Sequence, residues 1–263
     1  MTYFGFLAIF LFVPIIIFLL ITWNDSRRGR LISGFKNGRA VWMAIALHMV
    51  VAVIYTTPWD NYLVATGVWY YNPELVTGVL IGYVPIEEYT FFVVETLLAG
   101  LWWWYLARRI TVSGLYTPSW RIRLFSTVVL ALLWTVALGY LIGGWPPATY
   151  LAITLVWALP PIGLQLIFGA DILWRHIRLV LLTIIPMTIY LSAADSLAIT
   201  SGTWTIDPDQ TTGIFLGSLP IEEAIFFLLT NVLIGFGITL LLAEESEKRL
   251  AELRAKIWKE KKT

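Results

Sequence analysis

Seven strongly apolar segments, separated by gaps that alternate between basic and non-basic, constrain the fold of this chain most. Each is about 20 residues long, which is the length of an α-helix that crosses the hydrocarbon core of a bilayer. In a chain that is 59% hydrophobic and 13% charged, they predict an all-α integral membrane protein with seven transmembrane helices. The segments lie at residues 3–23, 40–57, 79–106, 123–142, 148–169, 177–198 and 214–243.

The positive charges predict the orientation of these helices. All 18 Lys and Arg residues lie in, or at the edge of, the gaps after the first, third and fifth segments, or in the tail after the seventh. The gaps at 58–78, 143–147 and 199–213 contain none. Because basic loops stay in the cytoplasm, we expect a multi-pass protein of the cell membrane with its N-terminus outside and its C-terminus cytoplasmic.

An internal repeat predicts how the helices are grouped. The sequence Pro-Ile-Glu-Glu at residues 85–88 recurs at residues 220–223. The 29-residue stretches that end with the two copies, residues 60–88 and 195–223, align without a gap and are identical at 11 positions. We therefore predict two parallel three-helix repeats, residues 1–107 and 144–243, related by an axis along the membrane normal. A linking fourth helix in residues 108–143 would join them.

The tail at residues 244–263 has the pattern of a cytoplasmic amphipathic helix. Leu250, Leu253 and Ile257 share one helical face among Lys, Arg and Glu. Such a helix is solvated or lies on the membrane surface, and we assign it no chemistry.

A loop of shared design precedes each Pro-Ile-Glu-Glu motif. Residues 68–78 and 203–213 each contain β-branched and aromatic residues on both sides of an Asn-Pro or Asp-Pro pair. Asn or Asp followed by Pro favours a type I turn, and the flanking residues favour strands. We expect each loop to form a short β-hairpin, and the two hairpins to pair with each other over the outer face.

The duplicated acidic residues are the first candidates for chemistry. Glu87 and Glu88, and their counterparts Glu222 and Glu223, lie about two turns inside the predicted third and seventh helices, where a charge is costly. Two adjacent carboxyls in a low dielectric cannot easily both ionise, so one is expected to keep its proton and to act as a general acid. A structural alternative stays open, because Pro followed by Glu is also an ordinary helix start.

Asp60 and Asp195 are equivalent residues at the ends of the helices that precede the two loops. Each is a candidate for a second acid or base, and each is equally a candidate for a turn-forming residue.

Helical spacing places aromatic rings beside the acids. Residues four apart share a face, so Glu87 aligns with Phe91 and Glu95, and Glu88 aligns with Phe92. An aromatic face stabilises a carbocation by about 0.5–2 kcal/mol per contact, although each ring alone is better explained by packing. The candidate substrate-binding residues are Phe91, Phe92, Glu95, Phe226, Phe227 and Asn231, with Trp69 and Trp204 from the loops.

Several classes of function are excluded by what the sequence lacks. Without Cys, and with His48 and His176 as its two histidines, it offers no credible metal site. No Lys lies within an apolar segment, which excludes a retinal Schiff base, and no G-x-G-x-x-G motif follows a strand. The net charge of +1 gives no indication of nucleic acid.

The duplicated run from Asp60 to Glu88, with the Phe-Phe pair that follows each motif, closely resembles the integral-membrane lycopene cyclase family. This is the cyclase type without a flavin-binding fold, found as two small subunits in some bacteria and as fused proteins in archaea and fungi. The resemblance covers about forty residues in each half, and the duplicated motif with its Gly-x-Trp loop is specific.

The resemblance implies acid-initiated cyclisation of lycopene to γ-carotene and then β-carotene, with no cofactor. It implies Glu87, Glu88, Glu222 and Glu223 as acid and base groups, with Asp60 and Asp195 as weaker candidates. The implied partners are a carotenoid that enters from the bilayer between the third and seventh helices, membrane lipid, and other enzymes of carotenoid synthesis. A C50 carotenoid cyclase and a proton-coupled transporter remain the alternatives.

Overall fold

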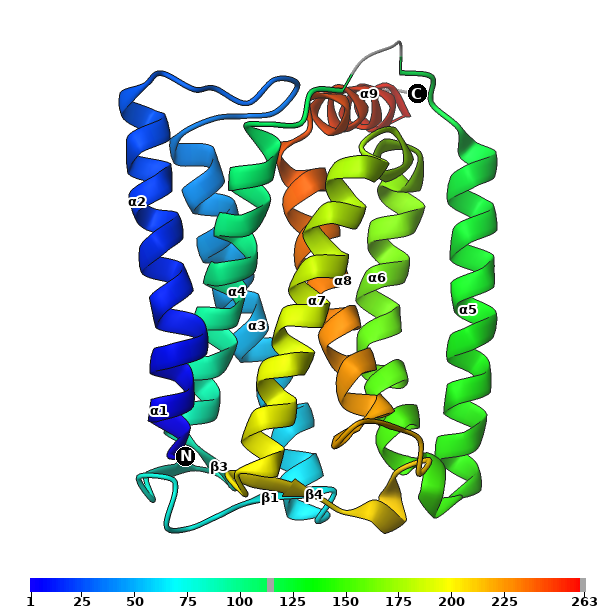
Figure 1. Cartoon of the computed structure of the whole chain (residues 1–263). Coiled ribbons are helices and arrows are strands. Elements are labelled where there is room, and N and C mark those ends of the chain that lie inside the picture. The colour runs from blue at the N-terminus through cyan, green and yellow to red at the C-terminus, as the bar shows by residue number, and fades with distance from the viewer. Residues whose placement is uncertain (113–115, 261–263) are drawn as a thin grey trace.

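The computed structural model describes residues 1–112 and 116–260, and within them seven helical segments are long and apolar enough to cross a membrane (Figure 1). The predicted number of spans is therefore confirmed. The first segment, Tyr3–Arg27, combines α1 (Tyr3–Leu7), a π-helical turn (Ala8–Phe12) and α2 (Val13–Arg27). The others are α3 (Arg39–Ala65), α4 (Ile86–Ala107), α5 (Trp120–Gly143), α6 (Thr149–Arg175), α7 (Ile177–Thr200) and α8 (Ile221–Leu242).

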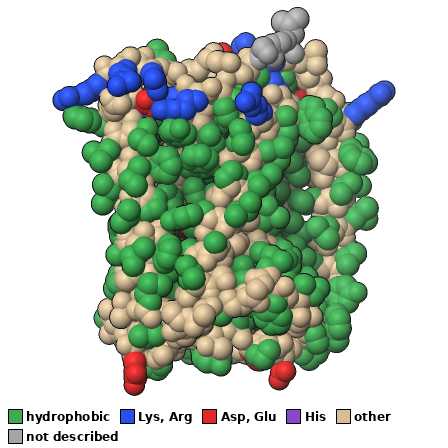
Figure 2. All heavy atoms as spheres, viewed as in Figure 1, with side chains coloured by type: hydrophobic (Ala, Val, Ile, Leu, Met, Phe, Trp, Pro, Cys, Tyr) green, Lys and Arg blue, Asp and Glu red, His purple; other side chains and the backbone are tan. Residues whose placement is uncertain are grey.

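The bundle has two chemically different ends. Lys and Arg side chains gather at one end, which we call the basic end, together with the last helix, α9 (Glu244–Glu260) (Figures 1 and 2). Six short strands lie at the other, which we call the strand end. Between them the surface is densely apolar, as a membrane-embedded surface must be (Figure 2).

Helices α4 and α8, which follow the two Pro-Ile-Glu-Glu motifs, form the centre of the bundle and run in the same direction (Figure 1). Most of their side chains are buried, whereas α5 is the most exposed span and packs mainly on α6. Near the basic end the Trp103 indole donates a hydrogen bond of 2.9 Å to Thr239 Oγ1. The two motif-bearing helices are thus in direct contact, which brings equivalent residues of the repeat close together.

The hairpins lie beyond the residues predicted for them. They join β2 (Leu80–Ile81) to β3 (Val84–Pro85), and β5 (Phe215–Leu216) to β6 (Leu219–Pro220). Each has a two-residue turn that begins with a glycine at positive φ, Gly82 or Gly217, as a type II′ turn requires. The prediction of a strand–turn–strand unit within residues 68–78 and 203–213 is therefore wrong.

The predicted pairing between the two loops is nevertheless present. Strand β1 (Trp69–Tyr71) pairs antiparallel with β4 (Trp204–Ile206), and Tyr70 lies opposite Thr205. These two residues occupy equivalent positions in the repeat. A residue can lie opposite its own counterpart only on a two-fold axis, so the axis that relates the two strands passes between them.

The hairpins also correct the depth of the acidic motifs. Because the apolar residues 79–84 and 214–219 belong to hairpins and turns, α4 and α8 begin at Ile86 and Ile221. Glu87 and Glu88 consequently lie in the first turn of α4, with Glu222 and Glu223 in the first turn of α8, rather than two turns inside each span. The helix-start interpretation of the motif therefore describes its local structure correctly.

Helix α9 is anchored at the basic end through Arg249. Its guanidinium forms an ion pair with Asp171 of α6 at 2.6 Å and also contacts the Tyr116 hydroxyl and the Phe168 carbonyl. Leu250 and Leu253 are half-exposed, while the side chain of Ile257 and residues 261–263 lie outside the described part of the tail.

Candidate active site

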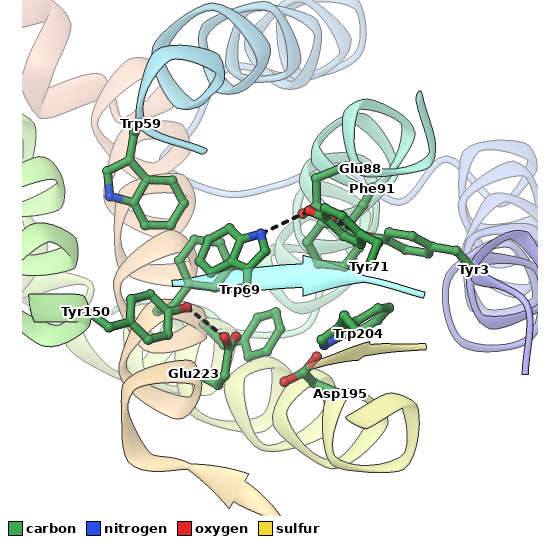
Figure 3. Close-up of a pocket in the computed structure, with 12 residues that line it drawn as sticks. Tyr3, Trp59, Trp69, Tyr71, Glu88, Phe91, Tyr150, Asp195, Trp204 and Glu223 are labelled. Carbon is green, nitrogen blue, oxygen red and sulfur yellow. Dashed lines mark hydrogen bonds between the residues drawn. The ribbon is translucent and has the colours of Figure 1, made fainter. Parts of the chain in front are cut away.

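A cavity of about 40 Å³ lies just inside the strand end, beneath the paired strands β1 and β4 (Figure 3). Both copies of the repeat contribute its walls, which combine carboxyl groups with aromatic rings. Its lining residues are Tyr3, Trp59, Trp69, Tyr71, Glu88, Phe91, Tyr150, Asp195, Trp204, Glu223, Phe226 and Phe227.

Glu88 is held by a chain of hydrogen bonds with a defined direction. The Tyr3 hydroxyl lies 2.5 Å and the Tyr71 hydroxyl 3.0 Å from the same oxygen, Glu88 Oε2. The Trp69 indole, which can only donate, bonds to the Tyr71 hydroxyl at 3.1 Å (Figure 3). Tyr71 therefore directs its own proton toward Glu88. One oxygen that accepts two phenol protons favours the ionised form of that carboxyl.

Glu223 occupies the equivalent position in the second copy but has fewer donors. The Tyr150 hydroxyl donates to Glu223 Oε1 at 2.7 Å (Figure 3). The residue equivalent to Tyr71 is Ile206, which has no polar group to offer. The two glutamates thus face one cavity with unequal numbers of hydrogen-bond donors. Because donors favour the ionised carboxylate, Glu223, which has fewer of them, is better suited to keep its proton.

Asp195 lies on the cavity wall beside Trp204 (Figure 3). Its counterpart Asp60 is fully buried and does not line the cavity. Asp60 is close enough to Glu88 and Glu223 to interact electrostatically with both, and the same holds for Asp195. Both carboxyl oxygens of Asp60 and one of Asp195 lack a hydrogen-bond partner among the described residues.

These four carboxyls have no cationic neighbour. The acidic members of the ion pairs found in residues 1–112 and 116–260 are Asp25, Asp171, Glu245 and Glu247, all near the basic end. Four carboxyls without counter-ions in an apolar site cannot all ionise, because each charge would be poorly solvated and would repel the others. The cluster can therefore hold at least one transferable proton and at least one acceptor.

The first glutamate of each motif points away from the cavity. Glu87 Oε1 accepts a hydrogen bond of 2.6 Å from the Thr77 backbone, and Glu222 Oε1 accepts two bonds of 2.7 Å from the backbone and hydroxyl of Thr212. These glutamates fix the loop that leads into each hairpin. Within each pair, the second glutamate faces the cavity.

The aromatic walls include most of the rings expected from the sequence. Phe91, Phe226 and Phe227 line the cavity, as do Trp69 and Trp204. In the first half the helical pairing differs from the expected one, because Glu88 shares the cavity with Phe91, three positions away, and not with Phe92. In the second half Glu223 shares it with Phe227, four positions away. Trp59, which was not predicted, stacks on Phe226 with their ring planes 6° apart.

A second, larger cavity of about 760 Å³ lies beside the first, among α3, α4, α6, α8 and α9, and Phe226 lines both. Phe92, Glu95 and His48 line the larger one. Asn231 is buried and donates to the Phe227 carbonyl at 2.8 Å, and it lines neither of these two cavities.

Sequence reasoning missed Tyr3 and Tyr150, although a signal for them exists. Each is preceded by a threonine and stands at the start of the first helix of its half. The two Thr-Tyr pairs are 147 residues apart, whereas the acidic motifs are 135 apart. An ungapped comparison therefore cannot align them, and a comparison that allows one gap would.

The fold and the site thus define a seven-span membrane protein in which buried carboxyls face an aromatic cavity. The family model described as lycopene cyclase matches residues 1–106 and 147–241, and the chain belongs to this family. The lycopene beta-cyclase of Halobacterium salinarum is 39% identical over 211 residues, which cover 78% of this chain and 85% of that protein.

Fungal relatives are longer than this chain. A bifunctional lycopene cyclase/phytoene synthase of Leptosphaeria maculans is 35% identical over 215 residues, covering 73% of this chain but 35% of the fungal protein. A protein of the same name from Podospora anserina is 35% identical over 207 residues, with 76% and 35% covered. No solved structure matches the chain.

Proposed function

We propose that this protein is a lycopene beta-cyclase, which closes the ends of lycopene to give γ-carotene and then β-carotene. The observation that carries the proposal is that Glu88 and Glu223, one from each copy of the repeat, face a single aromatic cavity without a counter-ion. The family membership and the name of the archaeal relative support the choice of substrate.

The reaction requires a proton donor and a proton acceptor and leaves the atom count unchanged. A proton added at C2 of the terminal C1=C2 bond places positive charge on C1. The C5=C6 bond attacks C1, which forms the C1–C6 bond and moves the charge to C5. Loss of the proton on C6 restores the double bond. Because the product is an isomer of the substrate, the enzyme is of the isomerase, or intramolecular lyase, class.

The unequal hydrogen bonding supports different roles for the two glutamates within one site. Glu223, with one tyrosine donor, is the general acid that protonates C2. Glu88, with two phenol donors on one oxygen, is the carboxylate that removes the proton from C6. The faces of the surrounding rings stabilise the intermediate cation, by about 0.5–2 kcal/mol per ring.

One turnover leaves the proton on Glu88 and must return it to Glu223. Asp60 and Asp195 interact electrostatically with both glutamates, and they are the carboxyls that we propose for this return. On this proposal the aspartates carry the proton between turnovers, and Glu87 and Glu222 hold the loops.

The charge distribution supports the orientation in the membrane. The Lys and Arg residues in the described part of the chain gather toward the basic end, which the positive-inside rule assigns to the cytoplasm. The candidate active site and the N-terminus then lie near the outer surface, and the C-terminal helix lies in the cytoplasm. The carotenoid substrate reaches the site from the bilayer.

Expression in cells that accumulate lycopene tests the function directly. We expect chromatography of the pigments to show lycopene replaced by γ-carotene and β-carotene, and Glu223→Gln to leave lycopene unchanged. Unchanged lycopene with the folded wild-type protein would refute the proposal, and a C50 product in cells that supply C50 precursors would move the assignment to that substrate class.

A further inference from the structure

The larger cavity is the strongest feature that the acid–base mechanism leaves unused. It follows α8 from Phe226 to Leu241, a rise of about 22 Å at 1.5 Å per residue. It therefore starts at the candidate active site and extends most of the way to the basic end. A volume of about 760 Å³ is in the range of sites that bind organic ligands.

The cavity opens sideways, through the surface that faces lipid. Val51 of α3 and Leu164 of α6 both line it, and their side chains are 50% and 71% exposed. An opening between apolar side chains at this depth admits a hydrocarbon from the bilayer without passing it through water. The opening lies between α3 and α6, whereas α4 and α8, the helices between which we expected entry, are in direct contact through Glu95 and Thr230.

At the basic end the cavity is lined by charged groups. Lys36 and Glu247 of α9 both line it and form an ion pair at 3.6 Å, and Arg254 lines the same end. This part of the wall is more polar than the rim at Val51 and Leu164, although Leu250 and Ala251 belong to it as well. The lateral opening is thus the entrance suited to a hydrocarbon.

The polar side chains midway along the cavity are mostly engaged with the protein. Glu95 Oε1 accepts from Thr230 at 2.9 Å, His48 Nδ1 lies 2.7 Å from the Ala44 carbonyl, and Gln165 Nε2 donates to the Leu233 carbonyl at 2.9 Å. The remainder of the wall is predominantly aliphatic and aromatic. The cavity can therefore accept a ligand that has no polar groups.

We propose that this cavity binds the extended polyene chain of the acyclic substrate while one end group occupies the smaller cavity. The inference rests on the proposed function and specifies how the substrate is held. Phe226 borders both spaces. An engineered cavity of about 150 Å³ binds benzene, so the 40 Å³ space must gain room before it holds a six-membered ring, and Phe226 is the ring at the boundary that must move.

One consequence concerns the order of events. A chain that lies along α8 presents one end to the acid, and its other end points toward the basic end. After the first ring has formed, the chain must therefore leave through the lateral opening and return in the opposite direction. Only then can the second ring form.

Neighbouring valines provide a matched test. Val51 lines the cavity and Val50 does not, while their exposures are 50% and 56%. We expect Val51→Trp to lower the initial rate of ring formation about tenfold or more by blocking the entrance, and Val50→Trp to stay within about twofold of wild type. Leu164→Trp, on the opposite rim, repeats the test if Val51→Trp does not fold.

A binding measurement separates this proposal from the proposed function. Glu223→Gln protein purified from lycopene-containing cells should retain lycopene, measured as pigment absorbance per protein, and adding Val51→Trp should remove most of it. Equal retention and equal rates for folded Val51→Trp, Leu164→Trp and Val50→Trp would overturn the cavity proposal and leave membrane lipid as the occupant. Failure of the wild-type protein to cyclise lycopene would instead overturn the function.

Discussion

Glu95 and Thr230 occupy equivalent positions in the two copies of the repeat, and the Thr230 hydroxyl donates a hydrogen bond of 2.9 Å to Glu95 Oε1. A residue that contacts its own counterpart must lie on the axis between the copies, as Tyr70 and Thr205 do at the strand end. The copies therefore share one interior. Because one partner is an acid and the other its hydrogen-bond donor, this interior is also chemically asymmetric.

This contact predicts different effects for two substitutions. Glu95→Gln keeps an oxygen that accepts from Thr230, so we expect cyclisation to stay within about twofold of wild type. Thr230→Val leaves a buried carboxyl without its donor and should lower the free energy of unfolding by about 1–3 kcal/mol. Thermal unfolding in detergent and pigment analysis measure the two effects. Complete loss of ring formation in folded Glu95→Gln would show that Glu95 takes part in proton transfer.

Tyr71 should hold its proton over the whole range in which the protein is handled. Burial, together with the nearby Asp60 and Glu88, raises the pKa of Tyr71 well above its ordinary value. Because folding raises this pKa, the contribution of Tyr71 to stability is constant below about pH 10 and falls above it. The cyclisation rate should therefore show no alkaline decline due to Tyr71 below that pH.

Replacing Tyr71 should leave less of Glu88 in the ionised form that accepts a proton, because this carboxyl loses one of its two phenol donors. We expect Tyr71→Phe to reduce the rate about tenfold, equivalent to a hydrogen bond to a charged group. Tyr70→Phe is the matched control, since Tyr70 is 54% exposed and does not line the cavity. An unchanged rate in Tyr71→Phe would contradict the role of this hydrogen bond.

Glu222 should behave as a loop anchor. Glu222→Ala removes the acceptor of two hydrogen bonds from Thr212 and should cost about 2–3 kcal/mol of stability, while Glu222→Gln should retain most of both stability and activity. The unfolding temperature and the rate per folded protein provide the comparison. If folded Glu222→Gln were as inactive as Glu223→Gln, Glu222 would belong to the proton-transfer machinery.

The number of helices was predictable from the sequence because the bilayer imposes it. A span needs about 20 apolar residues, and basic residues mark alternate gaps, so hydropathy alone located all seven. The hairpin at residues 80–85 was not predictable by hydropathy, because a short apolar run can be read as strand or helix. Gly82 at the first turn position was the signal that distinguished them.

The composition of the candidate site was predictable only in part. The repeat identified the glutamate pairs. Which member of each pair faces the cavity depends on the residue at which the helix begins, and the preceding hairpin sets that residue. Helix α4 starts at Ile86, which turns Glu88 inward and Glu87 toward Thr77. Tyr3 and Tyr150 come from helices whose spacing differs from that of the motifs, so the repeat could not show them.

A single site that acts on one end at a time predicts a free intermediate. During a time course with purified protein and labelled lycopene, labelled γ-carotene should accumulate before β-carotene. Unlabelled γ-carotene added in excess should dilute the label in the β-carotene formed later. Label that passes into β-carotene undiluted would mean that both ends react without release.

The central claim is that the two copies build one active site with an acid and a base, and matched single variants test it most directly. Pigments should be measured in lycopene-accumulating cells that express Glu88→Gln, Glu223→Gln, or both variants as separate chains. We predict that neither variant forms either ring and that co-expression restores nothing, while the wild-type protein produces β-carotene. Ring formation at about half the wild-type rate in each single variant, as two independent sites would give, would contradict the account.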